Sequence, residues 1–189
     1  MGKIIVQNVR CSYVFVETPR KKDNGEDGKY SIQILIPKGD PQLKKINRLI
    51  KGALEETHGA GAWGKKGMYK LPLRDGDDER DSPEYEGMYF MNTNSGRKPG
   101  IVNRNGEPAD QNDIEEMCYS GAVFHVSVNL YGFKAKDGSK PGVAVGLNNI
   151  MLRKAGERLD GSVGATTDFA EFVDEGSDDE FDEFDEFDD

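Results

Sequence analysis

Cationic and aromatic side chains alternate along three stretches of this sequence. Lysine and arginine neutralise phosphates, and aromatic rings stack on bases, so this mixture is typical of surfaces that bind nucleic acid without cutting it. The cations of the first stretch lie near glycine, and Trp63 follows a glycine-rich segment that has no apolar period to explain a core tryptophan. The candidate contacts in the three stretches are Arg20, Lys21 and Lys22; Trp63, Lys65, Lys66 and Tyr69; and Tyr89, Arg97 and Lys98.

A further candidate surface lies on residues 122–130 and the tyrosine that follows them. Phe124, Val126, Val128 and Leu130 alternate with polar residues, which predicts a strand with one buried face. The other face carries His125, Asn129 and Tyr131, and it either contacts bases or is an ordinary solvent-facing sheet surface.

Motifs for enzyme chemistry are incomplete. GAGAWGKK at 59–66 has phosphate-loop spacing, but Lys66 stands where a magnesium-binding hydroxyl is needed. DGDDERDSPEYE at 75–86 resembles a calcium loop, yet Arg80 replaces the glycine of its sharp turn, so we expect a solvated loop. The sequence predicts neither a metal site nor a cofactor. Its two cysteines, Cys11 and Cys118, form no CxxC pair and suit a reducing compartment.

The acidity of the chain is concentrated at its C-terminal end. Of 35 acidic residues, 11 lie in 174–189, so the formal charge of −10 becomes +1 without that segment. We expect 174–189 to be disordered, because like charges repel and three phenylalanines bury too little area to offset the loss of chain entropy. The regular spacing of Phe181, Phe184 and Phe187 favours a docking peptide over a merely solubilising end.

The elements that must position these residues are mostly strands. Hydrophobic periodicity predicts strands at 3–16, 29–36, 87–92, 122–130 and 142–152, and helices at 41–57 and 110–117. The long helix has Asp40 as its expected N-cap, Pro41 in its first position and Gly59 at its end. Short strands punctuated by glycine favour a small barrel or sandwich, and this element order suits a five-stranded barrel with an inserted helix. We expect one domain at 1–160, a linker at 161–173 and neither a membrane span nor a secretion signal.

Four segments in one order carry a family resemblance: PLRDGDDER at 72–80, YEGMYFMNTNSGRKPGIV at 85–102, YSGAVFHVSVNLYGF at 119–133 and GVAVGLNNIMLRKAGERL at 142–159. Together they resemble phage-encoded single-stranded-DNA-binding proteins. The resemblance implies an OB-fold, a five-stranded Greek-key barrel, that coats single-stranded DNA during phage replication and recombination. It also implies an acidic tail that competes with DNA for the groove. Here Phe187 is followed by Asp188 and Asp189, so the chain lacks the terminal aromatic residue of several such proteins.

The leading hypothesis is therefore non-catalytic binding of single-stranded DNA in the cytoplasm of an infected bacterium. The tail would recruit replication proteins such as a polymerase or helicase-primase. Whether copies of the chain also associate into a homo-oligomer is left open by the sequence. Two alternatives remain open at this point: a metal-dependent phage nuclease or resolvase that uses the 75–86 carboxylates, and a protein-interaction adaptor without DNA affinity.

Overall fold

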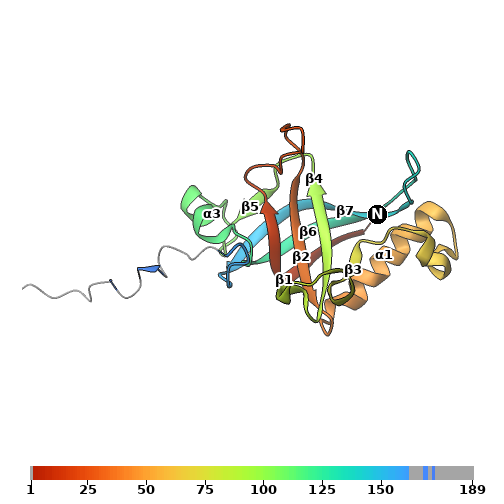
Figure 1. Ribbon diagram of the computed structural model, residues 1–189, viewed down its shortest axis with the longest axis horizontal. Coiled ribbons are helices and arrows are strands. Elements are labelled where there is room, and N and C mark those ends of the chain that lie inside the picture. Colours follow the sequence, from red (N-terminus) through yellow and green to blue (C-terminus); the bar gives the residue numbers. More distant parts are fainter. Residues whose placement is uncertain (1, 162–167, 170–171, 173–189) are drawn as a thin grey trace, which may run out of the picture.

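Five strands form a closed barrel in the computed structural model, which describes residues 2–161, 168, 169 and 172 (Figure 1). The barrel strands are β1 (Gly2–Phe15), β2 (Tyr30–Pro37), β4 (Met88–Ser95), β6 (Val123–Phe133) and β7 (Gly142–Lys154). Neighbouring strands pair in the order β4-β2-β1-β6-β7, and a parallel pairing of Asn94 with Gly146 joins β4 to β7. This order and closure are those of the OB-fold, which confirms the predicted fold class.

The barrel interior is built by alternating side chains, as the sequence predicts. Phe124, Val126, Val128 and Leu130 of β6 are all fully buried, while the residues between them are partly exposed. On β2, however, both faces are covered. Ile32, Ile34 and Ile36 point into the barrel, whereas Leu35 packs on its outside in a small cluster with Tyr85 and Phe90.

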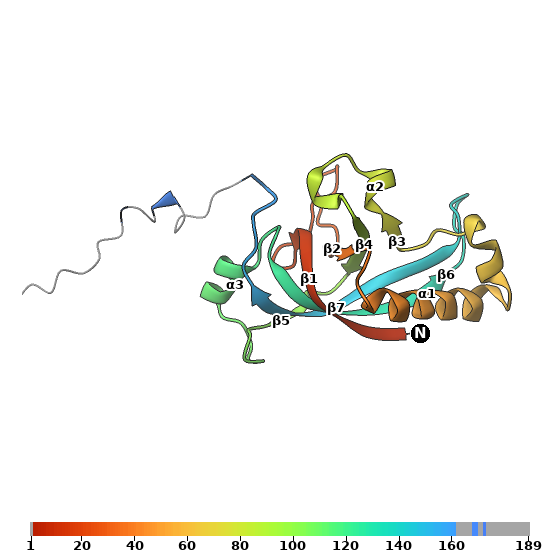
Figure 2. The ribbon, with the colours of Figure 1, turned by 90° about the horizontal axis from the view of Figure 1, so that it is seen from below.

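Helix α1 (Gln42–His58) lies between β2 and β4 in the chain and packs against β6, β1 and β7 (Figure 2). Leu43, Ile46 and Ile50 lie on its buried face. The predicted start is wrong by one residue, because Pro41 is the N-cap and Gln42 the first helical residue. Asp40 nevertheless accepts a 2.9 Å hydrogen bond from the Gln42 N–H, and Gly59 ends the helix with a positive φ of 94°.

Short elements between α1 and β4 escaped the sequence analysis. They are the 3₁₀ helix η1 (Ala62–Met68), strand β3 (Leu73–Asp75), helix α2 (Gly76–Glu79) and the 3₁₀ turn η2 (Pro83–Tyr85). The expectation that 75–86 is a solvated loop is wrong. Asp75 caps α2 by accepting a 3.0 Å bond from the Asp77 N–H, and Tyr85 is buried. This segment covers one end of the outer β2–β4 face and leaves the other end open.

Strand β5 (Gly100–Val102) and helix α3 (Gln111–Met117) lie between β4 and β6. Asp110 and Asp113 form a capping box at the start of α3, in agreement with the predicted helix at 110–117. Helices long and apolar enough to cross a bilayer are absent from the described part of the chain. The proposed tail at 174–189 lies outside the described residues.

Candidate nucleic-acid interface

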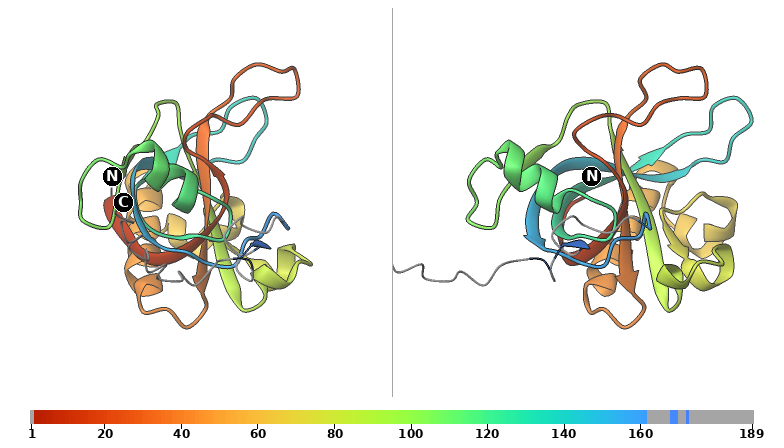
Figure 3. Two further views of the ribbon diagram at one scale, coloured as in Figure 1. Left: turned by 90° about the vertical axis from the view of Figure 1, so that its left-hand side faces the viewer. Right: turned by 60° about the vertical axis from the view of Figure 1, so that its left-hand side comes forward.

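The open end of the outer β2–β4 face holds a groove of about 780 Å³, which we call the β2–β4 groove. One wall is the loop between β1 and β2, which projects from the barrel on the same side as the loop between β6 and β7 (Figure 3). Cations, two aromatic rings and polar amides line it. These residues are Arg20, Lys21, Lys22, Lys29 and Arg80; Tyr13 and Phe15; and Gln33, Asn92 and Asn94.

Tyr13 is presented to this groove by an irregularity in β1. The pairing of β1 with β2 shifts between Ser12 and Phe15, and Tyr13 has a φ of 49°, in the left-handed region that bulky residues rarely adopt. Its backbone N–H donates to Ser120 Oγ at 3.2 Å, and 58% of the residue is exposed. A strained backbone that holds an exposed ring in a groove indicates a functional position.

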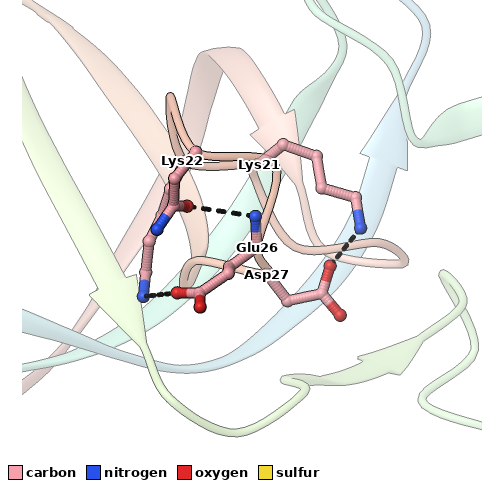
Figure 4. Close-up of polar contacts among 5 residues, drawn as sticks. Lys21, Lys22, Glu26 and Asp27 are labelled. Carbon is pink, nitrogen blue, oxygen red and sulfur yellow. Dashed lines mark hydrogen bonds and ion pairs between the residues drawn. The ribbon is translucent and has the colours of Figure 1, made fainter.

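The β1–β2 loop is a small ordered hairpin rather than a loose chain (Figure 4). The Lys22 N–H donates to the Glu26 carbonyl at 2.9 Å, and Lys22 Nζ lies 3.3 Å from a Glu26 carboxylate oxygen. Lys21 forms an ion pair with Asp27. Two of the three predicted cations are thus held by carboxylates of their own loop, and a phosphate must compete with Glu26 and Asp27 for them.

The combined substitution Glu26→Gln and Asp27→Asn is expected to strengthen single-stranded DNA binding at low salt by roughly two- to fivefold. Both ion pairs are more than half exposed, so salt should weaken them and the gain should vanish as ionic strength rises. Fluorescence anisotropy with a labelled oligonucleotide measures the change. The pair Glu115→Gln and Glu116→Gln on α3 makes the same charge change away from the groove, and an equal gain there would refute local competition.

Two more grooves continue from the first across β4. Asn92 and Asn94 also line a groove of about 230 Å³ beside Phe133, which we call the Phe133 groove. Leu71 and Arg74 are shared between that groove and a third one, of about 720 Å³, which contains Trp63 and which we call the Trp63 groove. Shared lining residues therefore connect the β1–β2 loop to Trp63 over the barrel surface.

The Trp63 groove brings together four of the predicted contacts: Trp63, Lys66, Tyr69 and Tyr89. Lys66 Nζ lies 5.1 Å from the centre of the Trp63 ring, so a cation and a stacking surface occupy one place. Trp63 also packs partly against the barrel core, which makes it both an anchor and a groove wall. Lys65 is exposed next to this groove in the chain but does not line it.

A close backbone contact holds the Trp63 segment on the barrel. The Lys70 N–H donates to the Pro141 carbonyl at 2.8 Å, and the Val143 N–H donates to the Lys70 carbonyl at 3.0 Å. A Cβ atom on Gly142 would lie 1.9 Å from the Lys70 carbonyl oxygen, so only glycine permits this approach. Arg97 and Lys98 lie elsewhere, exposed in the turn between β4 and β5 and outside all three grooves.

His125, Asn129 and Tyr131 of the candidate face on β6 line none of these three grooves, although Phe133 of the same strand and Ala144, which pairs with Tyr131, line the Phe133 groove. Asn129 Nδ2 donates to Asn148 Oδ1 at 3.1 Å, and Tyr131 is 38% exposed. His125 Nδ1 accepts a 2.9 Å hydrogen bond from the Asn8 N–H, where β1 bulges and Asn8 has a φ of 48°. His125 thus stabilises the bulge, a structural role that its sequence pattern did not indicate.

This contact predicts a pH dependence of stability. Burial, and secondarily the positive charge of Arg153, lower the pKa of His125 below its usual value of about 6.5. The unfolded chain therefore takes up a proton first, so the free energy of unfolding should fall as pH drops below about 6.5 and level off below the folded-state pKa. Urea unfolding between about pH 7.5 and pH 5.5 should show this fall in the free energy of unfolding. In His125→Gln the part of the fall that is due to His125 should be missing. Identical pH profiles for both proteins would contradict the assignment.

The acidic cluster at 75–86 binds cationic side chains of the protein itself. Lys38 Nζ lies 2.7 Å from Asp75 and 2.6 Å from Asp77, and its hydrogen bonds lower the pKa of both carboxyl groups. Glu79 accepts a 2.7 Å bond from Arg74 Nε. Across residues 2–161 and the three described beyond them, no three His, Cys, Asp or Glu side chains are grouped as metal ligands.

Several groove residues were missed by sequence reasoning. Tyr13 and Phe15 lay within a predicted strand, where aromatic residues usually pack in the core. Asn92 and Asn94 alternate with buried Met91 and Thr93, and this period-2 pattern alone marks them as outward residues of β4. The lysine-rich turn between β6 and β7 is a further missed signal, with Lys134, Lys136 and Lys140 all exposed.

Comparison with known proteins agrees with this geometry. A family model described as Enterobacter phage Enc34, ssDNA-binding protein, matches residues 2–182. The structure of the single-stranded DNA-binding protein from bacteriophage Enc34 in complex with ssDNA is 28% identical, with a TM-score of 0.69, over 84% of this chain and 89% of that one. A second structure of the Enc34 protein is 29% identical over 89% of this chain and 90% of that one, with a TM-score of 0.67.

The single-stranded DNA-binding protein gp2.5 encoded by bacteriophage T7 shares the fold at 18% identity. Its TM-score is 0.60, over 93% of this chain and 98% of that one. A search of curated proteins found no match.

Proposed function

Because the chain belongs to the family of single-stranded-DNA-binding proteins represented by that of Enterobacter phage Enc34, we propose that it binds and coats single-stranded DNA without strong sequence preference. The observation that carries this proposal is the β2–β4 groove, which joins cations to the exposed Tyr13 ring on the face where OB-folds bind oligonucleotides. Cations would hold phosphates while rings stack on unpaired bases, and no covalent bond is made or broken.

The proposed contacts divide by location. In the β2–β4 groove, Arg20, Lys21 and Lys22 bind phosphates and Tyr13 stacks on a base. From there the strand crosses β4 and reaches Trp63, where Lys66 offers a further phosphate contact. This path is supported by the residues shared between adjacent grooves. Arg97 and Lys98 would contact DNA only where it leaves the grooves.

Anisotropy titrations of the full-length protein with single-stranded and duplex oligonucleotides, each at two salt concentrations, test the proposal. Affinity should be higher for single strands, because stacking requires unpaired bases, and it should fall steeply with salt as counterions are released. Equal affinity for both forms, or an affinity that salt does not change, would refute it.

We further propose that the chain acts in phage replication and recombination in the host cytoplasm. In this proposal the three Asp-Glu-Phe repeats of 174–189 recruit a replication protein such as a polymerase or helicase-primase. The same segment competes with DNA for the basic grooves, because tethering holds it at an effective concentration of order millimolar. Side-by-side coating would place copies of the chain in contact with one another.

Deletion of 174–189 should strengthen single-stranded DNA binding at low salt by roughly three- to tenfold, and the gain should shrink as salt screens the tail. Replacing Phe181, Phe184 and Phe187 by serine keeps all 11 acidic charges. That variant should retain the affinity of the full chain but lose partner recruitment in a pull-down with replication proteins. An unchanged low-salt affinity after deletion would eliminate competition by the tail.

A further inference from the structure

A buried polar chain lies beneath the floor of the β2–β4 groove. Gln33 of β2 is 4% exposed, and its side-chain oxygen Oε1 is the acceptor for two hydroxyl groups. Ser12 Oγ donates to it at 3.0 Å, and the Tyr85 hydroxyl also donates to it. Ser12 and Tyr85 are themselves buried, so these contacts form away from solvent.

The two hydroxyl groups determine which way the Gln33 amide points. Burial raises the pKa of the Tyr85 phenol, which keeps its hydroxyl protonated and able to donate. If the amide were reversed, its NH2 group would face both hydroxyl oxygens. Tyr85 and Ser12 are close enough to bond to each other, but only one of the two O–H groups can donate in that bond, and the other would lose Oε1 as its acceptor. Leaving a buried donor unpaired is unfavourable, so Oε1 faces the hydroxyls.

The orientation of the Gln33 amide determines that of the Asn92 amide at the groove surface. Gln33 Nε2 donates to Asn92 Oδ1 at 2.8 Å, which engages the oxygen of the exposed Asn92 amide. Lys29 Nζ donates to Asn94 Oδ1 at 3.4 Å, and an ammonium group can only donate. Asn92 and Asn94 lie two residues apart on the outer face of β4, and each is left with its NH2 group for a ligand.

We propose that Asn92 and Asn94 form a hydrogen-bond-donating floor that makes the groove favour thymine over cytosine, an inference that rests on the proposed binding of single-stranded DNA. Thymine presents the O4 acceptor where cytosine presents the N4 amino donor. An asparagine NH2 group bonds to the former and meets a second donor in the latter. Both bases are pyrimidines of similar size, and they differ most in this pattern of donors and acceptors. In this account Gln33, Ser12 and Tyr85 are positioning residues that do not touch DNA.

Dissociation constants of the full-length protein for oligo(dT) and oligo(dC) of equal length test this inference. Wild type should bind oligo(dT) roughly three- to tenfold more tightly, the effect of about one net hydrogen bond. Asn92→Asp should reverse the ratio, because a carboxylate accepts from the cytosine amino group. The added charge repels both ligands equally and cancels in the ratio. Asn112→Asp on α3 adds the same charge outside the groove and should leave the ratio unchanged.

The double variant Ser12→Ala and Tyr85→Phe tests the positioning role. Without both hydroxyls, the Gln33 amide is free to reverse, so the ratio should move towards one while the salt dependence stays the same. A wild-type ratio of one, or a ratio that Asn92→Asp leaves unchanged, would overturn the inference even if the double variant failed to fold. Failure to bind either oligonucleotide would overturn the proposed function, and the inference with it.

Discussion

Tyr13→Ala is expected to weaken single-stranded DNA binding by roughly one to two orders of magnitude, the largest effect of any single substitution in the grooves. Removing an aromatic ring on which a base stacks costs about 1–3 kcal/mol. Tyr13 is 58% exposed and lines the β2–β4 groove, so loss of its ring opens no core cavity. Anisotropy at high salt is the appropriate measurement, because screening then suppresses the phosphate contribution and leaves stacking.

Two further variants separate stacking from other roles of Tyr13. Tyr13→Phe keeps the ring and should retain most of the affinity. Tyr131→Ala removes a tyrosine that is 38% exposed on β6, outside the grooves, and should have little effect. A larger loss from Tyr131→Ala than from Tyr13→Ala would move the DNA to the β6 face with His125 and Asn129.

Replacing Arg20, Lys21 and Lys22 together by glutamine is expected to have the second large effect, on the salt dependence of binding. Each phosphate contact on single-stranded DNA contributes about 0.7 to the slope of log K against log salt. Loss of three contacts should therefore reduce the slope by about 2 and weaken low-salt binding by roughly ten- to a hundredfold. The measurement is a salt titration of affinity.

A matched control distinguishes direct phosphate contacts of the β1–β2 loop from a general effect of net charge. Lys44, Lys45 and Lys51 are exposed on α1 and line none of the grooves. Their replacement by glutamine lowers the net charge by the same amount but should leave the slope almost unchanged. Equal slopes for the two triple variants would show that general attraction, and not the β1–β2 loop, holds the phosphates.

The barrel was predictable where one face of a strand is buried and the other is open. On β6 the alternation from Phe124 to Leu130 indicates both the strand and its inward face, and these side chains are fully buried. On β2 the pattern was incomplete. Leu35 and Gln33 are covered from outside by residues 75–86, a tertiary contact that a local pattern does not contain.

The site was predictable in its residue types more than in its location. The cations of the β1–β2 loop and the predicted contacts of the Trp63 groove were found because their charge and aromatic content can be read directly from the amino-acid sequence. Tyr13 was missed because its exposure depends on a bulge and a φ of 49°, which apolar periodicity does not reveal. Asn92 gains its proposed role from Gln33 and Asn94 from Lys29, two residues that lie far from them in the chain, and Gln33 lies opposite Asn92 in the sheet.

Photo-crosslinking of the full-length protein to a single-stranded oligonucleotide that carries iododeoxyuridine tests most directly where the DNA lies. On irradiation this base reacts with aromatic side chains in contact with it, and mass spectrometry of the digested protein identifies the residue. Binding in the grooves predicts crosslinks at Tyr13 and Phe15, with Trp63 labelled by longer strands. Crosslinks confined to Tyr131 on β6, with Tyr13, Phe15 and Trp63 unlabelled, would contradict the central claim.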